Sequence, residues 1–328
     1  MSTVYCKCCE KEYNGLSFYN IKLDKLDDPK IVNALYNKNP ELCNEFSDNI
    51  FICSHCFSEL FNVCKRCGNI YIKNELCSCV SKRILSYYNK QTVFPEYKSE
   101  VQFKELRLGL EIETILKCKQ DTSEVLENFS NTLGRNLCKF KSDSSLGQYG
   151  IEIVTMPLYF EHLISLKKKF IEAFRYYRQQ GGWSYKDYRT GLHIHLSRKA
   201  FTSYKHLYNF YIGVTKNQRF TQRIAKRKAN CYCEFPINPF VRGYNQIFKQ
   251  KLYSRHDAVN FNNKETIEVR VYKGSIAWHN IQSYVEHVYS LFKYSLLITQ
   301  QNKDFTVDSY RCFILENKNE YPELVKVI

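Results

Sequence analysis

The stretch "TGLHIHLSR" (190–198) decides how the larger part of this chain is interpreted. His193 and His195 lie two residues apart and alternate with aliphatic residues, which is the period of a β-strand. One face of this strand is therefore expected to be aliphatic, and the other to carry two imidazoles. A surface edge strand could carry the same pattern, so the other strands must distinguish that case from a metal-binding face.

Three other stretches repeat this alternation, namely "LRLGLEIETIL" (106–116), "GIEIVTM" (150–156) and "AVNFNNKETIEVRVY" (258–272). The last is expected to include a hairpin that turns at Asn262 and Asn263. In each stretch one face is aliphatic, and the other carries ionisable side chains: Glu111, Glu113, Glu152, Glu268 and Arg270. The four stretches together predict one sheet with a strongly polar face.

Four carboxylates on one face are costly unless a cation lies among them. Two such charges about 4 Å apart repel by roughly 4 kcal/mol at an effective dielectric near 20. Ligand sets rich in oxygen, with one histidine tolerated, suit Mg²⁺ or Mn²⁺. We therefore expect a divalent cation on this face, although a solvated Glu-x-Glu strand is common when it occurs alone.

Helices are expected at 123–137, 160–180 and 281–298. Gly181 and Gly182 are expected to end the second of them. The apolar stripe of the third helix is predicted to be core: Ile281, Tyr284, Val285, Val288, Phe292 and Leu296.

Composition and cysteine placement predict two parts. The chain has 328 residues, 44% of them apolar, which is enough for a folded core. We expect a cysteine-rich module at 1–90, a linker at 91–104 and a larger domain at 105–328. No signal peptide or long apolar run is evident, so a soluble cytoplasmic protein without a membrane partner is expected. The frequent Tyr, Lys, Asn and Ile suggest an AT-rich genome, such as that of a low-GC bacterium or its phage, and in the phage case host cytoplasm.

The net charge of +15 belongs mostly to the larger part. Residues 1–100 carry 13 basic and 12 acidic side chains, whereas residues 101–328 carry 35 and 21. The larger part is therefore expected to bind an anionic partner. Within it, "KNQRFTQRIAKRK" (216–228) is either a solvated helix face or a docking surface for a nucleic acid, an acidic polymer or nucleotide phosphates.

Ten of the fifteen cysteines lie in the first 79 residues. In a reducing compartment such clustering indicates metal binding, because a Cys-x2-Cys turn aims two sulfurs at one ion. Two structural zinc sites are predicted, one from Cys64, Cys67, Cys77 and Cys79 and one from Cys6, Cys9, Cys53 and Cys56. Cys8, Cys43 and His55 are substitute ligands, and unligated thiols or a zinc ribbon that docks a partner are the alternatives.

The larger part resembles a known family. The stretches in question are, in chain order, "GLEIE" (109–113), "DSSLGQYGIEIVTMP" (143–157), "TGLHIHLS" (190–197) and "AVNFNNKETIEVRVYKGS" (258–275). In this order they are similar to the putative amidoligase family, a branch of the carboxylate–amine ligases related to glutamine synthetase and glutamate–cysteine ligase. The resemblance covers about residues 105–300 and leaves the cysteine-rich part unexplained.

This resemblance implies an α+β fold with a curved, mainly antiparallel sheet and helices on one face, as in glutamine synthetase. The cysteine-rich part would be a small module of zinc-ribbon or treble-clef type. The implied activity is amide or peptide bond formation through an acyl phosphate, driven by ATP. The implied cofactors and substrates are ATP, Mg²⁺ or Mn²⁺, a carboxylate-bearing substrate and an amine.

The resemblance also implies roles for single residues. Glu113 and Glu152 would hold the Mg²⁺ nearer the acyl substrate. The Mg²⁺ on the ATP phosphates would be held by Glu111, His193 and Glu268. Arg270 would stabilise the γ-phosphoryl group during transfer, and His195 would lie near the phosphates. Arg270, Glu113 and Glu152 are thus the expected catalytic residues, while Asp143 and Asn260 match family positions without an assigned role.

Two other classes of function fit the same residues. One is a zinc-containing nucleic-acid-binding protein whose ligase-like domain is inactive. The other is a metal-dependent hydrolase or nuclease that uses the His and Glu cluster without ATP. The sequence does not identify the acyl and amine substrates or the oligomeric state.

Overall fold

The structure is a computed structural model that describes the following residues: 4–6, 8–13, 18–22, 34–35, 37–38, 49–63, 70–73, 84–85, 105–118, 122–134, 137–184, 189–248 and 256–328. The chain divides into two compact units, residues 1–83 and 84–328. The predicted linker at 91–104 lies outside the described residues, as do four predicted zinc ligands: Cys64, Cys67, Cys77 and Cys79.

The second unit has an α+β fold whose sheet is mostly antiparallel. Among the described residues, its strand order is β13–β14–β12–β8–β10–β9–β7, with β11 paired to β8 beside this path. The strands are β7 (Ile84–Leu85), β8 (Leu108–Leu116), β9 (Cys138–Ser142), β10 (Gly150–Thr155), β11 (Gly182–Trp183), β12 (Gly191–Ser197), β13 (Val259–Asn260) and β14 (Thr266–Lys273). Among the described strands of this sheet, only β7 and β9 pair in parallel. The four predicted strands are confirmed, and so is the hairpin, which joins β13 and β14.

The pairing of β12 with β14 contains a β-bulge. Ile194 lies opposite Val269, so a regular register would place Leu192 opposite Val271, but it lies opposite Tyr272. Arg270 and Val271 therefore both lie opposite the single residue His193. A bulge re-aims the side chains beside it, and this one lies where Arg270 joins the polar face of the sheet. The sequence did not predict it.

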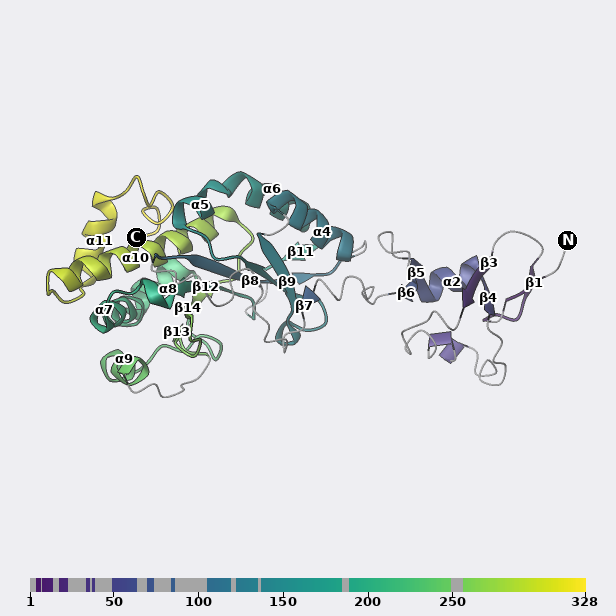
Figure 1. The fold of residues 1–328 in the computed structure, drawn as a ribbon, viewed down its shortest axis with the longest axis horizontal. Coiled ribbons are helices and arrows are strands. Elements are labelled where there is room, and N and C mark those ends of the chain that lie inside the picture. The colour runs from purple at the N-terminus through teal and green to yellow at the C-terminus, as the bar shows by residue number, and fades with distance from the viewer. Residues whose placement is uncertain are drawn as a thin grey trace. The chain divides into compact units, whose positions relative to one another are not determined.

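The helices of the second unit are α4 (Thr122–Leu133), α5 (Phe160–Ser165), α6 (Lys167–Gln179), α7 (Tyr204–Thr215), α8 (Gln218–Ala225), α9 (Pro239–Phe248), α10 (Trp278–Gln300) and α11 (Val307–Glu316). Figure 1 shows α4, α5 and α6 along one side of the sheet. The helix expected at 160–180 is two helices, because the chain leaves helical geometry at Leu166. Gly181 has a φ of 92°, and α6 ends just before it, as predicted. None of the helices in the described part of the chain has the length and hydropathy needed to cross a membrane.

The core of the second unit lies between the aliphatic face of the sheet and the helices. Phe129 of α4 packs edge-on against Phe174 of α6, with ring centroids 5.0 Å apart. On the sheet, the hydroxyl of Thr114 is hydrogen-bonded to that of Tyr177 at 2.7 Å. Tyr272 stacks on Tyr284 of α10 with centroids 4.6 Å apart. The side of β8, β12 and β14 that faces the helices is therefore closed by packed side chains, which leaves the other face for the polar groups.

The described residues of the first unit form short strands, helix α2 (Ser54–Leu60) and two helical fragments at 34–35 and 37–38. The strands pair as β1 (Val4–Tyr5) with β2 (Glu12–Tyr13), β3 (Phe18–Lys22) with β4 (Asn49–Cys53), and β5 (Phe61–Val63) with β6 (Ile70–Ile72). Helix α2 follows β4 directly. The buried residues in the described part of the first unit form one small cluster, half of which is cysteine: Cys6, Cys8, Leu35, Ile52, Cys53, Cys56, Phe57 and Phe61.

Candidate functional site

The polar face of the sheet brings the predicted residues together in register. Glu152 of β10 lies opposite Glu113 of β8, and His193 of β12 lies opposite Glu111. His195 lies opposite Glu268 of β14. Because opposite residues of an antiparallel pair point to the same side, these side chains share one face. The alternation seen in the sequence is thus realised across neighbouring strands.

His193 lies at the centre of this group. Its side chain is only 4% exposed, and its two ring nitrogens face three carboxylates. Nδ1 lies 3.3 Å from Oε1 of Glu268 and 3.6 Å from Oε2 of Glu111, and Nε2 lies 3.7 Å from Oε1 of Glu113. Nδ1 is buried without a hydrogen-bond partner among the described residues. An imidazole nitrogen in this setting fits a cation that shares those carboxylates.

His195 is oriented from its other side. Its Nδ1 is hydrogen-bonded to the hydroxyl of Thr266 at 3.1 Å, while Nε2 lies 3.4 Å from Oε1 of Glu111. In the part of the chain that the structure describes, Nε2 has no hydrogen-bond partner. A hydrogen bond to one ring nitrogen fixes the orientation of the ring and leaves the other nitrogen for a metal.

Glu268 and Arg270 form the β14 side of the site. Oε1 of Glu268 accepts a hydrogen bond from Nη1 of Arg270, and Oε2 accepts one from Nδ2 of Asn260 at 2.8 Å. Asn260 thereby gains a role that the sequence did not give it, because it orients a candidate ligand. Asp143, also without an assigned role, caps a short turn by accepting from the backbone N–H of Ser145 at 2.9 Å.

Lys141 is a member of the site that sequence reasoning missed. It lies on β9 opposite Glu152. Its Nζ lies 3.5 Å from Oε2 of Glu152 and 3.6 Å from Oε1 of Glu111. A signal existed, since "CKFKS" (138–142) alternates like the other strands. The stretch is short, however, and only its pairing with β10 shows that the lysine joins the carboxylates.

The carboxylates of the site have opposed pKa shifts. Burial raises the pKa of Glu111, but the positive charges of His195 and Lys141 outweigh burial and bring this pKa well below its usual value. Burial and then the charge of Glu111 raise the pKa of Glu152 well above its usual value. For Glu268, burial raises the pKa but Arg270 lowers it more. Such divergence between neighbouring groups is typical of functional sites.

The donor set fits one or two cations. Two overlapping groups offer ligand atoms that all lie within 4.8 Å of one another: Glu111, Glu152 and His193, and Glu111, His195 and Glu268. Glu111 belongs to both groups. Glu113, expected to pair with Glu152 at one ion, belongs to neither of these groups within the described residues. Carboxylate oxygens are ligands for hard cations such as Mg²⁺ and Mn²⁺, whereas imidazole nitrogens also suit transition metals such as Zn²⁺ and Fe²⁺.

Glu113 instead lies beside Gly191 and a second arginine. Its Oε2 accepts a hydrogen bond from the backbone N–H of Gly191 at 2.5 Å. A Cβ built on Gly191 would lie 2.8 Å from Nη1 of Arg227, 3.1 Å from Nε2 of His193 and 3.3 Å from Oε2 of Glu113. The glycine of the "TGLHIHLSR" stretch therefore leaves room for three ionisable groups to meet. The sequence placed Arg227 on a basic helix instead of at the site.

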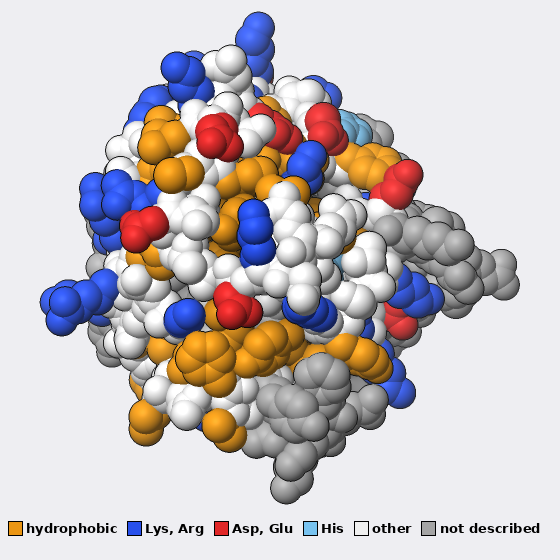
Figure 2. All heavy atoms as spheres, turned by 90° about the vertical axis from the view of Figure 1, so that its left-hand side faces the viewer, with side chains coloured by type: hydrophobic (Ala, Val, Ile, Leu, Met, Phe, Trp, Pro, Cys, Tyr) orange, Lys and Arg blue, Asp and Glu red, His pale blue; other side chains and the backbone are white. Residues whose placement is uncertain are grey.

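The basic segment at 216–228 is not a single helical face. Helix α8 covers only Gln218–Ala225, and Lys226 ends it in the left-handed conformation with a φ of 54°. Lys216, Arg219 and Arg223 are exposed, whereas Arg227 turns inward. On the face shown in Figure 2, Lys and Arg side chains are dispersed among acidic and apolar ones. The structure thus separates Arg227 from the exposed basic residues with which the sequence grouped it.

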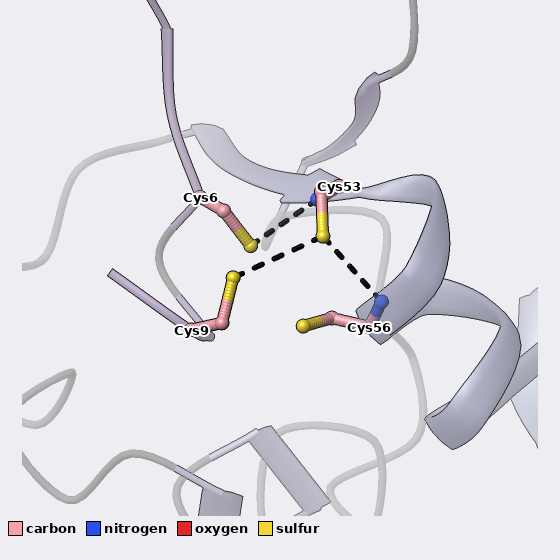
Figure 3. Close-up of side chains that lie close together, drawn as sticks. All are labelled: Cys6, Cys9, Cys53 and Cys56. Carbon is pink, nitrogen blue, oxygen red and sulfur yellow. Dashed lines mark hydrogen bonds between the residues drawn. The ribbon is translucent and has the colours of Figure 1, made fainter. Parts of the chain in front are cut away.

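Four thiols of the first unit converge on one point (Figure 3). Cys6 and Cys9 flank the turn between β1 and β2, Cys53 ends β4, and Cys56 lies in the first turn of α2. Sγ of Cys6 accepts from the backbone N–H of Cys53 at 3.2 Å, and Sγ of Cys9 lies 4.0 Å from Sγ of Cys53. The four ligand atoms lie within 4.8 Å of one another, and none of these four cysteines forms a disulfide with a described residue. This cluster could hold a metal ion and is consistent with a structural zinc.

Two comparisons with known proteins were negative. No family model matches this chain, and no curated protein matches it. The amidoligase resemblance consequently stays a prediction, and the function has to be argued from the residues of the site.

Proposed function

We propose that this protein is an ATP- and Mg²⁺-dependent carboxylate–amine ligase that forms an amide or peptide bond through an acyl phosphate. The observation that supports this best is the convergence of acidic, histidine and arginine side chains from β8, β10, β12 and β14 on one face. These are the residue types that the amidoligase pattern implies. The geometry departs from that pattern in the position of Glu113 and in the presence of Lys141.

Five side chains are the candidate cation ligands: Glu111, Glu152, His193, His195 and Glu268. Mg²⁺, when bound there, would offset the negative charge of the ATP phosphates. Arg270 would bind the transferred phosphoryl group by charge-assisted hydrogen bonds, since its guanidinium is already held in place by Glu268. Thr266 and Asn260 would keep His195 and Glu268 in position.

The proposed reaction has two steps whose atoms balance. A carboxylate oxygen of the acyl substrate attacks the γ-phosphorus of ATP, the bond to the β,γ-bridging oxygen breaks, and ADP leaves. The amine nitrogen then attacks the acyl carbon and phosphate leaves, while the amine releases one proton. No step needs a covalent protein nucleophile, so the residues act by positioning and by electrostatic stabilisation.

For the first unit, we propose that Cys6, Cys9, Cys53 and Cys56 bind a structural Zn²⁺. Four soft thiolates in a closed set suit this ion better than Mg²⁺. The small apolar cluster around them supports a role in folding, since metal binding supplies folding free energy in modules that lack a larger core.

The test is binding of ATP to the full chain, measured by calorimetry with and without Mg²⁺. Glu111→Gln removes a carboxylate that both ligand groups share, and it should weaken Mg²⁺-dependent binding by about 100-fold or more, because even outer-shell partners contribute 10–100-fold. Glu172→Gln, an exposed change on α6, should bind as the wild type does. Circular dichroism would show that both variants are folded.

Each outcome has a meaning. Binding that requires both Mg²⁺ and Glu111 supports the proposal, and the release of ADP on adding candidate acids and amines would then identify substrates. ATP binding that is indifferent to Mg²⁺ and to Glu111→Gln would sink it. Cleavage of a phosphodiester or peptide without ATP, lost in Glu111→Gln, would favour the hydrolase or nuclease alternative. Salt-dependent binding of DNA or RNA without ATP binding would favour the nucleic-acid alternative.

A further inference from the structure

Arg227 reaches the polar face from a loop that the chain holds firmly. Lys226 ends α8 in the left-handed conformation and stays exposed, where its Nζ donates to Oδ1 of Asn280 at 2.6 Å. The chain then turns, and Asn230 and Cys233 exchange backbone hydrogen bonds of 3.3 and 2.9 Å. Arg227 lies in the segment between these two anchors, so its position does not depend on a free loop.

The guanidinium of Arg227 is only partly satisfied. Nη1 donates to the backbone carbonyl of Tyr272 at 3.3 Å, while Nη2 is buried without a hydrogen-bond partner among the described residues. Nε of Arg270 is likewise buried and unpartnered there. Buried cationic nitrogens without acceptors are costly, so a pair of them beside one site indicates an anion that binds between protein groups.

The electrostatic surroundings agree with this view. Burial lowers the pKa of Arg227, and the positive charge of Arg270 lowers it further, while Cys233 and Glu113 raise it. The two guanidinium groups are thus close enough to repel each other. Two like charges held together by the fold are stabilised when an anion joins them.

We propose that Arg227 and Arg270 together bind one oxyanion of the substrate, either a phosphoryl or a carboxylate group, beside Gly191. This inference rests on the proposed function and deepens it, because it adds Arg227 to the residues that touch substrate. Guanidinium groups bind such oxyanions through paired N–H donors. Because Gly191 has no Cβ, Nη1 of Arg227 can lie next to His193 and Glu113, and a larger residue at this position would prevent that approach.

The experiment titrates the full-length protein with inorganic phosphate and, separately, with acetate, following binding by calorimetry and thermal stability. Arg227→Gln should bind the responding anion about tenfold or more weakly, as expected for the loss of a charge-assisted hydrogen bond. Arg227→Lys keeps the charge and should lose less, which guards against a variant that merely misfolds. Arg223→Gln is the matched control, since Arg223 is exposed one turn earlier on α8.

The two anions distinguish a phosphoryl group from a carboxylate as the bound oxyanion. A response to phosphate alone assigns the site to a phosphoryl group, and a response to acetate assigns it to a substrate carboxylate. Binding of neither anion by the wild type, or equal binding by wild type and Arg227→Gln, overturns the inference. Phosphate binding that needs Arg227 in a protein that fails to bind ATP with Mg²⁺ would instead overturn the proposed ligase and leave the oxyanion site standing.

Discussion

The thiol cluster of the first unit and the carboxylate cluster of the second both fit cations, but they differ in what surrounds them. Three of these thiols, those of Cys6, Cys53 and Cys56, belong to a small buried cluster that also includes Ile52 and Phe57. The carboxylates lie on a sheet whose opposite face is packed against helices through Phe129, Phe174 and other aromatic side chains. A cation would therefore stabilise the fold of the first unit, whereas in the second unit it would serve only the function.

Metal removal should therefore have its largest effect on the first unit. Cys56→Ser removes one of four ligands, and the unit should lose its structure, because structural zinc sites contribute about 10–16 kcal/mol of apparent binding free energy. Limited proteolysis with mass spectrometry would locate new cleavage within residues 49–63, while residues 256–328 stay protected. Cys312→Ser, an exposed change on α11, is the control. Unchanged protection and zinc content in Cys56→Ser would contradict the claim that a bound cation stabilises the fold of the first unit.

The second unit should depend on its core instead. Phe129→Ala deletes a fully buried ring that packs against Phe140, Phe174 and Tyr177, and it should lower the free energy of unfolding by about 3–5 kcal/mol. Phe240→Ala, at a side chain that is 48% exposed, should have a much smaller effect. Denaturant unfolding at equilibrium measures both. A loss below 1 kcal/mol for Phe129→Ala would contradict a core-supported second unit, since about 1 kcal/mol is ordinary for any substitution.

Period-2 alternation was enough to predict the main strands, but not their partners. β8, β10, β12 and the β13–β14 hairpin were predicted, because each places aliphatic residues on one face. α7 was not, since "YKHLYNFYIGVT" is buried almost all round and therefore shows no amphipathic period. The break in the helix at Leu166 has no glycine or proline to announce it.

The site was predicted in its residue types and missed where it depends on long-range pairing. Alternation within each strand was enough to place Glu111, His193 and Glu268 on one polar face. Their assignment to a single ion came from the resemblance, and the structure divides His193 and Glu268 between two ligand groups. Lys141 and Arg227 could not, because a β9–β10 register and a turn after α8 bring them in. The β-bulge beside Arg270 is likewise a property of two strands together and has no signature in either.

Lys141 tests whether the carboxylate cluster of the second unit is neutralised by the protein itself when no cation is bound. Lys141→Met removes the positive charge between Glu111 and Glu152, and without divalent ions it should lower the free energy of unfolding by about 2–3 kcal/mol, less than for a fully buried pair. Mg²⁺ adds stability when it binds only the folded state. It should stabilise this variant more than the wild type, because the variant lacks the lysine charge that offsets the two carboxylates. Lys168→Met, exposed on α6, is the control. If Lys141→Met is as stable as the wild type without Mg²⁺, the lysine does not neutralise the carboxylates.

Histidines on the two sides of the sheet should respond oppositely to pH. Burial lowers the pKa of His195, but the charge of Glu111 raises it more, so the net shift is upward. Among the described residues no carboxylate raises the pKa of His287 of α10, and burial lowers this pKa to about 3. Nδ1 of His287 is hydrogen-bonded to the hydroxyl of Tyr272 at 2.8 Å.

His287 should therefore make the second unit less stable in mild acid. The unfolded chain takes up a proton at this residue below about pH 6.5, whereas the folded chain does not until about pH 3, so stability is lost as pH falls through this window. From pH 7 to pH 5 the free energy of unfolding should fall by about 2 kcal/mol from this group. His287→Gln, which cannot titrate, should have a smaller pH slope, so that between pH 7 and pH 5 it loses about 2 kcal/mol less than the wild type when urea unfolding is measured at both pH values. An unchanged slope would mean that His287 is solvated in the folded protein. The sheet face that packs against the helices would then not differ from the polar face in the way proposed.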